Sequence, residues 1–116
     1  MTARELRTDQ LDQESERLAA LAAALVRDLD EIIDSAQLNN IDDEHDPDGS
    51  TVAYERAMVS ALLDATRRDL AAVELARSRL RSGTDGTCVG CGGPIAPERM
   101  EALPLTTTCI RCAQER

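Results

Sequence analysis

Four cysteines constrain this chain more than any other feature, because they stand near its carboxy-terminal end in the arrangement C-x2-C-x17-C-x2-C. Each Cys-x-x-Cys pair can place two thiolates on one side of a tight turn, and two such pairs complete a tetrahedron. The spacing therefore predicts one structural Zn²⁺ with four ligands: Cys88, Cys91, Cys109 and Cys112. Because four thiolates leave no position for water or substrate, we do not expect a catalytic zinc.

Other uses of the cysteines agree less well with the sequence. Two disulfides would need an oxidising compartment, but the opening residues MTARELRTDQ contain no apolar run of a secretory signal. A redox motif of the thioredoxin type would need a surrounding βαβ pattern, and none is visible. Gly92 and Gly93 follow the first pair directly, where the backbone must turn around a metal and glycine accepts a positive φ. We therefore expect a reduced, cytoplasmic protein with a zinc-bound turn.

A heptad pattern runs from Thr2 to about Asn39, without Gly or Pro, and predicts a long helix with one apolar seam. Thr2 and Glu5 have the spacing of a capping box, although Thr8 or Asp9 could also begin the helix. The residues of this seam are Leu11, Leu18, Leu25 and Ile32, with Ala22, Leu29 and Ala36 between them.

A second seam lies between Ser50 and Arg81, and Gly83 is placed to end this helix as a C′ glycine. Its residues are Val59, Leu63, Thr66, Leu70, Val73 and Leu80. Two amphipathic helices in succession predict a helical hairpin. Seams of this kind can also pair between chains, but the turn formed by residues 46–49, Asp-Pro-Asp-Gly, favours pairing within one chain, so we expect a monomer.

The predicted fold class is therefore mainly α, an antiparallel two-helix coiled-coil hairpin followed by a small zinc-binding module with four cysteine ligands. We place the hairpin at residues 1–82, its acidic tip at 40–50 and the zinc module at 83–116. At 1.5 Å per helical residue, the tip is expected about 45 Å from the metal.

The charge balance excludes several classes of function. With 22 acidic and 13 basic residues, the chain has a formal charge of −9, which phosphate backbones repel. Residues 83–116 contain three arginines, four acidic residues and no aromatic side chain for base stacking, so direct sequence-specific nucleic-acid binding is not expected. No apolar run approaches the roughly 18 residues of a membrane span. Without such a run, we expect no membrane partner. No nucleophile–base pair or phosphate loop is present, so we predict that the protein is not an enzyme.

The connection between the helices concentrates acidic residues, and it has two interpretations. It can be an ordinary solvated turn, or it can deliver negative charge into a narrow site on a partner. His45 is expected to be an exposed tip residue, because four thiolates already satisfy the metal. The acidic residues are Asp42, Asp43, Glu44, Asp46 and Asp48.

The chain resembles the DksA/TraR family of bacterial C4-type zinc finger transcription factors, as a short, actinobacterial-like member. The resemblance rests on the long helical hairpin and on three runs of residues, namely Gly86-Thr87-Cys88-Val89-Gly90-Cys91-Gly92, Ile95 with Arg99-Met100-Glu101-Ala102 and Pro104, and Cys109-Ile110-Arg111-Cys112. It implies a transcription regulator that binds RNA polymerase and inserts its coiled-coil tip into the secondary channel, near the catalytic Mg²⁺. The tip residues that it implies are Asp46, Asp48 and His45.

The sequence departs from the family pattern in two places. The tip commonly reads D-x-x-D-x-A, whereas His45 occupies the first aspartate position here, with Asp46 one residue later and Asp48 at the second position. Leu103 and Ala113 replace basic residues that alarmone-responsive relatives carry, which argues against alarmone binding at that site. The alternative function is a zinc-stapled coiled-coil adaptor that does not act on RNA polymerase.

Overall fold

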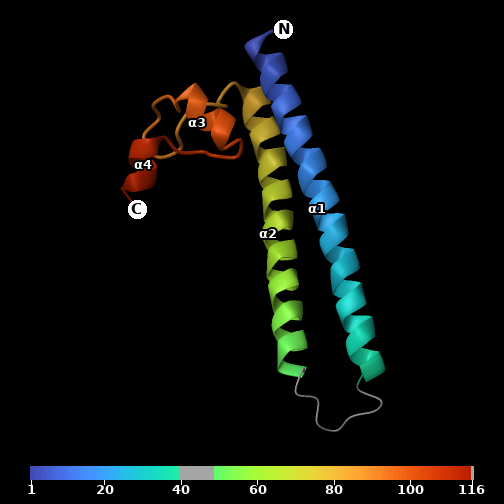
Figure 1. The fold of residues 1–116 in the computed structure, drawn as a ribbon. Helices are drawn as coiled ribbons and strands as arrows, with labels where there is room; N and C mark the ends of the chain where they lie inside the picture. Colours follow the sequence, from blue (N-terminus) through green and yellow to red (C-terminus); the bar gives the residue numbers. More distant parts are fainter. Residues whose placement is uncertain (40–48, 116) are drawn as a thin grey trace. The chain divides into compact units, whose positions relative to one another are not determined.

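The computed structural model of the chain describes residues 1–39 and 49–115, which form four helices. The two long helices are α1 (Ala3–Asn39) and α2 (Gly49–Ser82), and the two short ones are α3 (Pro97–Ala102) and α4 (Ile110–Gln114). Figure 1 shows α1 and α2 running antiparallel, and α3 and α4 following the end of α2. Among the described residues, extended pairing is limited to one isolated bridge between Thr87 and Pro94. The predicted fold class, a helical hairpin followed by a small cysteine module, is confirmed.

Local sequence signals define the ends of the long helices. At the start of α1, the Thr2 amide donates to the Glu5 carboxylate and the Glu5 amide donates to Thr2 Oγ1, both at 3.1 Å. This is the predicted capping box. At the end of α2, Gly83 has φ +81°, its amide donates to the Leu80 carbonyl, and the Thr84 amide donates to the Arg79 carbonyl. These two bonds form a Schellman motif, which confirms the predicted role of Gly83.

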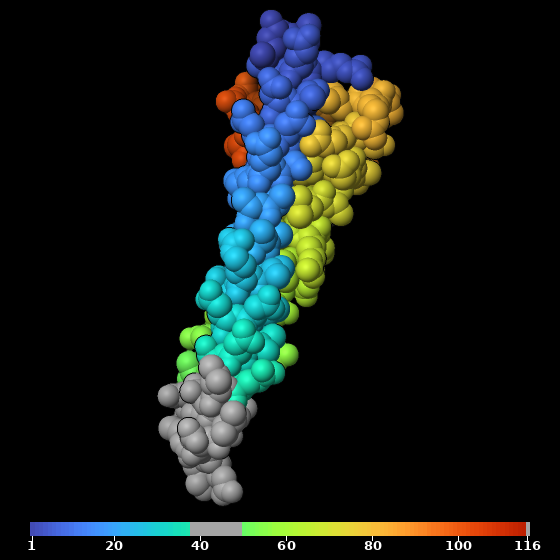
Figure 2. Space-filling model, turned by 90° about the vertical axis from the view of Figure 1, so that its right-hand side faces the viewer, coloured from blue at the N-terminus to red at the C-terminus, as the bar shows by residue number. Residues whose placement is uncertain are grey.

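The chain divides into two compact units, each with its own core. The first, here called the zinc unit, comprises residues 1–16 and 69–116, and it buries Leu11 and Val73 completely. In Figure 2 the amino-terminal residues of α1 (blue) lie directly against the last turns of α2 (gold), both within this unit. The unit also buries Ala76, Cys88 and Ile95.

The second, here called the helix-pair unit, comprises residues 17–68. Its buried residues are Leu18, Leu25, Leu63 and Thr66, all on the predicted seams. The Thr66 hydroxyl is satisfied inside the seam, because it donates to the Leu62 carbonyl at 2.7 Å. None of the helices described combines the length and apolar character that a bilayer span requires. The helix α2 ends at Ser82, where the sequence placed the boundary between the hairpin and the zinc module. That this position separates two domains stays a prediction.

Candidate metal centre

The first cysteine pair lies in a tight turn that follows α2. The Cys88 amide donates to the Gly93 carbonyl at 2.8 Å, and the Gly92 amide donates to the Cys88 carbonyl at 2.9 Å. Gly92 has φ +74°, so a side chain at this position would be strained, as the sequence predicted. Gly93 does not need a positive φ; its amide instead donates to Cys91 Sγ at 3.4 Å. Backbone hydrogen bonds thus close the turn on itself.

The second pair lies at the start of α4. Cys109 is the N-cap of this helix, and its Sγ accepts from the Cys112 amide at 3.5 Å. The two turns are joined by a hydrogen bond from the Val89 amide to the Thr107 carbonyl at 2.9 Å. The Arg99 guanidinium of α3 donates to the Thr108 carbonyl at 2.9 Å. This bond holds the backbone segment that precedes Cys109. All four thiols therefore approach one point from two turns that are tied together.

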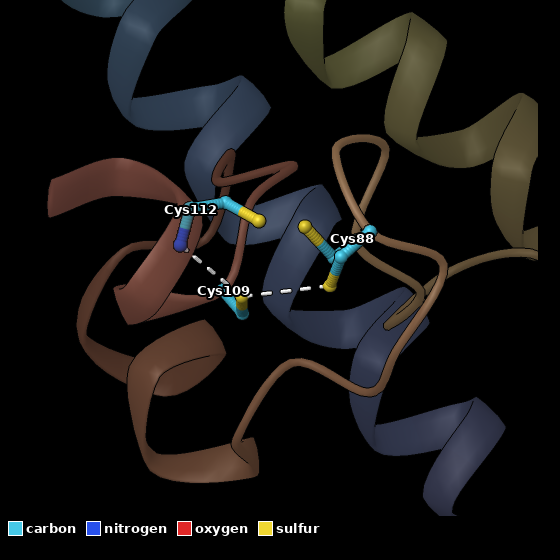
Figure 3. A group of neighbouring side chains, drawn as sticks. Cys88, Cys109 and Cys112 are labelled. Atoms are coloured by element: carbon cyan, nitrogen blue, oxygen red, sulfur yellow. Dashed lines mark hydrogen bonds between the residues drawn. The ribbon is translucent and has the colours of Figure 1, made fainter. Parts of the chain in front are cut away.

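The geometry of the four sulfur atoms fits a tetrahedral zinc ion. Sγ atoms of Cys88, Cys91, Cys109 and Cys112 all lie within 4.8 Å of one another. Figure 3 shows the side chains of Cys88, Cys109 and Cys112 facing one another across this cluster. A tetrahedron with Zn–S bonds of about 2.3 Å puts neighbouring sulfurs about 3.8 Å apart, and Cys91 Sγ lies 3.8 Å from Cys109 Sγ. The protein therefore has one structural zinc site, as the spacing predicted.

The polar surroundings of the sulfurs shift their protonation. Backbone amides, first that of Cys109 and then those of Cys91 and Gly90, lower the pKa of Cys88 to about 6. Hydrogen bonding with Cys109, Cys88 and Cys91 raises the pKa of Cys112 to about 12. Repulsion by the neighbouring Cys109 raises the pKa of Cys112 further, because neighbouring sulfurs cannot all be anionic without a cation between them. A divalent zinc ion supplies that positive charge, and N–H···S hydrogen bonds share the remaining negative charge.

One glycine of the site escaped the sequence analysis as a functional position. A Cβ on Gly90 would lie 3.1 Å from Cys112 Sγ and 3.3 Å from Cys112 Cβ, so the second turn packs directly on this residue. The Gly90 amide also donates to Cys88 Sγ at 3.3 Å. The signal was present in the C-V-G-C run, where a glycine inside a metal turn indicates a close approach.

A second feature that the sequence did not reveal is the attachment of the zinc module to α1 within the zinc unit. Arg7 donates to both carboxylate oxygens of Asp85, at 2.9 and 3.1 Å, and to the Pro104 carbonyl at 2.9 Å. The two charged side chains are only 10% and 13% exposed. Gln10 donates to the Met100 carbonyl at 3.0 Å. Arg7 and Asp85 are 78 residues apart, so no local pattern could pair them.

The predicted tip residues are not part of this site. His45, Asp46 and Asp48 lie outside the described residues, between the end of α1 at Asn39 and the start of α2 at Gly49. Their assignment as tip residues stays a prediction.

Three comparisons with known proteins agree with this arrangement. Residues 81–116 match the model of the prokaryotic dksA/traR C4-type zinc finger. An uncharacterized protein of Aquifex aeolicus (strain VF5) is 30% identical over 64 residues, which are 55% of this chain and 44% of that protein. The chain therefore matches less than half the length of this relative. The structure of transcription factor DksA2 from Pseudomonas aeruginosa is similar over 97% of this chain and 81% of that one, with a TM-score of 0.77 and 21% identity. At that identity, the likeness shows the fold.

Proposed function

The chain belongs to the DksA/TraR family, with its C4-type zinc finger at residues 81–116, and from this we propose that it regulates transcription by binding RNA polymerase. The observation that carries the proposal is the combination of two parts in one chain. A C4 finger alone occurs in many kinds of protein, but here it follows a long helical hairpin, and the similarity to a transcription factor extends over 97% of the chain. Function therefore rests on the hairpin and the finger together.

The proposed mechanism uses the hairpin to carry charge into the polymerase. Asp46 and Asp48, with His45 beside them, would enter the secondary channel, through which nucleotides reach the catalytic Mg²⁺. Carboxylates there would act by electrostatics and hydrogen bonding on the active site and its moving elements. The zinc ion would hold the module that attaches to the polymerase, and no bond would be made or broken by this chain. In this role it is a cytoplasmic regulator and not an enzyme.

The decisive experiment is in vitro transcription with purified cognate polymerase, with and without the protein. We expect the unmodified chain to change the yield of initiated transcripts, and Asp46→Asn/Asp48→Asn to bind polymerase normally but lose most of that effect. The matched control is Asp42→Asn/Asp43→Asn, which removes the same charge from the same connection and should regulate normally.

Two results would contradict the proposal in different ways. If polymerase is not retained by the immobilised protein at low salt, the proposed regulation of RNA polymerase is contradicted and the alternative adaptor function is favoured. If polymerase binds but Asp46→Asn/Asp48→Asn regulates as well as the unmodified chain, the two aspartates belong to an ordinary solvated turn.

A further inference from the structure

An open groove lies between α1 and α2 within the helix-pair unit. It has a volume of about 600 Å³, and apolar side chains of both helices line it. Tyr54, Met58 and Leu62 of α2 are 67%, 48% and 52% exposed, so the groove is open to solvent and does not enclose a small molecule. The remaining apolar lining comes from Ile32, Val52 and Val59.

The groove exists because the side chains of the apolar seam are less buried in this part of the two helices. Leu25 of α1 and Leu63 of α2 are still buried, but no residue described between 26 and 37 or between 50 and 62 is. Ile32 and Val59, on the predicted seams, are only half-buried. Within this unit, Figure 1 shows that the distance between α1 and α2 increases toward the carboxy-terminal end of α1 and the amino-terminal end of α2. Apolar surface that a tighter coiled coil would cover is therefore left in contact with water.

The rim of the groove is acidic. Asp28, Glu31 and Glu55 line it together with the apolar side chains, and none of the three forms an ion pair with another described residue. The described residues between Arg27 and Arg56 have the same sign, because they include five acidic residues and no Lys or Arg, namely Asp28, Asp30, Glu31, Asp34 and Glu55. Uncompensated negative charge beside an exposed apolar strip disfavours acidic partners and attracts basic ones.

We propose that this groove is a docking site for an amphipathic helix of the partner protein, with apolar side chains on one face and Lys or Arg along the edges of that face. Its apolar face would lie on Met58, Leu62 and Ile32, and its basic edges would meet Asp28, Glu31 and Glu55. The identity of the partner as RNA polymerase rests on the proposed function. The chemistry of the groove is independent of that function. The site is distinct from the predicted acidic tip. It would determine which part of the hairpin the partner binds.

Tyr54 makes this proposal directly measurable. The chain contains one Tyr, no Trp and no Phe, so its intrinsic fluorescence reports on the groove alone. The probe is a synthetic helical peptide of about 18 residues, about 27 Å long, with leucines on one face, lysines beside them and no aromatic residue. We expect a saturable change in Tyr54 emission that weakens as salt is raised, because the acidic rim is exposed.

Variants that keep Tyr54 separate apolar from charged contributions. Met58→Ala/Leu62→Ala should weaken peptide binding about ten-fold or more, since apolar side chains at the centre of an interface carry most of its energy. Glu31→Gln/Glu55→Gln should weaken it about three-fold and reduce the salt dependence. The matched controls are Leu21→Ala/Leu75→Ala, which truncates exposed apolar residues outside the groove, and Asp30→Asn/Asp34→Asn, which removes equal charge from α1 outside it. Both controls should bind within about two-fold of the unmodified chain.

The same variants are then tested for binding to the purified polymerase. Loss of binding in Met58→Ala/Leu62→Ala with normal binding of both controls is the expected result. If the unmodified chain does not bind polymerase, the proposed function fails, and the peptide titration still decides the chemistry of the groove.

Three outcomes of the peptide titration would overturn the docking site itself. They are the absence of a saturable Tyr54 response, equal binding of a peptide with glutamates in place of lysines, and equal binding by the groove variants and their controls. A Tyr54 signal that changes with protein concentration alone would show that a second copy of the chain covers the groove, which also contradicts the proposal.

Discussion

The zinc unit and the helix-pair unit use the same two helices but hold them together differently. In the zinc unit, Leu11 and Val73 are fully buried, and the zinc module is attached to α1 through Arg7 and Gln10. In the helix-pair unit the apolar seam is the main link, and it thins beyond Leu25. The zinc unit has eight arginines for eleven acidic residues, whereas the helix-pair unit has five for eleven. The zinc unit is built for stability, and the helix-pair unit leaves apolar surface and negative charge available.

The difference shows how a small chain can present an incompletely packed surface. A pair of helices with a thin seam is marginal by itself, because ordering each residue costs conformational entropy that only burial can offset. Metal binding and buried polar links stabilise the zinc unit without requiring more apolar residues. The helix-pair unit can then keep exposed side chains such as Tyr54, which lines the proposed docking site. Four predictions test this division, from the largest expected effect to the smallest.

Removing the metal should affect only one of the two units. Chelation of zinc, or Cys109→Ser, should unfold residues 86–115, because a structural zinc contributes roughly 10–16 kcal/mol of apparent binding free energy. Hydrogen exchange should show lost protection there, while amides of the helix-pair unit stay protected. Val89→Ala is the control, since this side chain lies in the same turn but is 59% exposed. Metal analysis well below one zinc per chain would contradict the site.

Zinc affinity should fall as the pH is lowered. In the metal-free protein at pH 7, Cys112 holds its proton, because its pKa is raised to about 12, whereas Cys88, with a pKa lowered to about 6, is mostly thiolate. Zinc must displace the Cys112 proton and any other thiol proton still bound, so affinity should drop at least about ten-fold per pH unit, and more steeply below about pH 6, where Cys88 also takes a proton. Calorimetric titration in buffers of different ionisation enthalpy counts the protons released. An affinity independent of pH between 5 and 7 would show that the thiols are not the ligands.

Truncations along the seam should cost less beside the groove of the helix-pair unit than in the buried part of the seam. Leu11→Ala removes a side chain that is 0% exposed and should lower the free energy of unfolding by about 3 kcal/mol. Ile32→Ala, at a half-buried position, should cost about 1 kcal/mol, because less apolar area is lost and solvent already reaches the site. Urea unfolding followed by circular dichroism measures both. Equal losses at the two positions would mean that the seam is uniformly packed in solution.

The attachment of the zinc module should depend on the shape of the guanidinium as well as on its charge. Arg7→Ala leaves the Asp85 carboxylate and the Pro104 carbonyl without their partner and should destabilise the zinc unit by about 2 kcal/mol. Arg7→Lys should recover only part of this, because an ammonium group cannot bind both carboxylate oxygens in the same geometry. Arg77→Ala is the control. Its pair with Asp12 is 25% and 49% exposed and should contribute under about 0.5 kcal/mol. The same urea titrations apply, and equal losses for Arg7→Ala and Arg77→Ala would refute a special role for Arg7.

Much of this molecule is determined by local patterns that can be read in the sequence. The zinc site follows from cysteine spacing, since a Cys-x-x-Cys turn places two sulfurs together whatever surrounds it. The helices follow from the heptads. The start of α1 follows from Thr2 and Glu5, and the end of α2 from Gly83, because their hydrogen bonds span only a few residues. In each case the signal and the structure that it specifies lie within one or two turns of chain.

Tertiary structure alone decided how these parts are joined and where the seam between the two helices stays open. The Arg7–Asp85 pair joins residues far apart in the sequence, so nothing local could indicate it. The groove likewise could not be predicted, because Ile32 and Val59 lie on the same apolar seams as the buried Leu25 and Leu63. A heptad pattern states which side of a helix is apolar, but it does not state how near the second helix lies. That distance depends on how all the facing side chains pack at once, and it separates a closed core from an open docking surface.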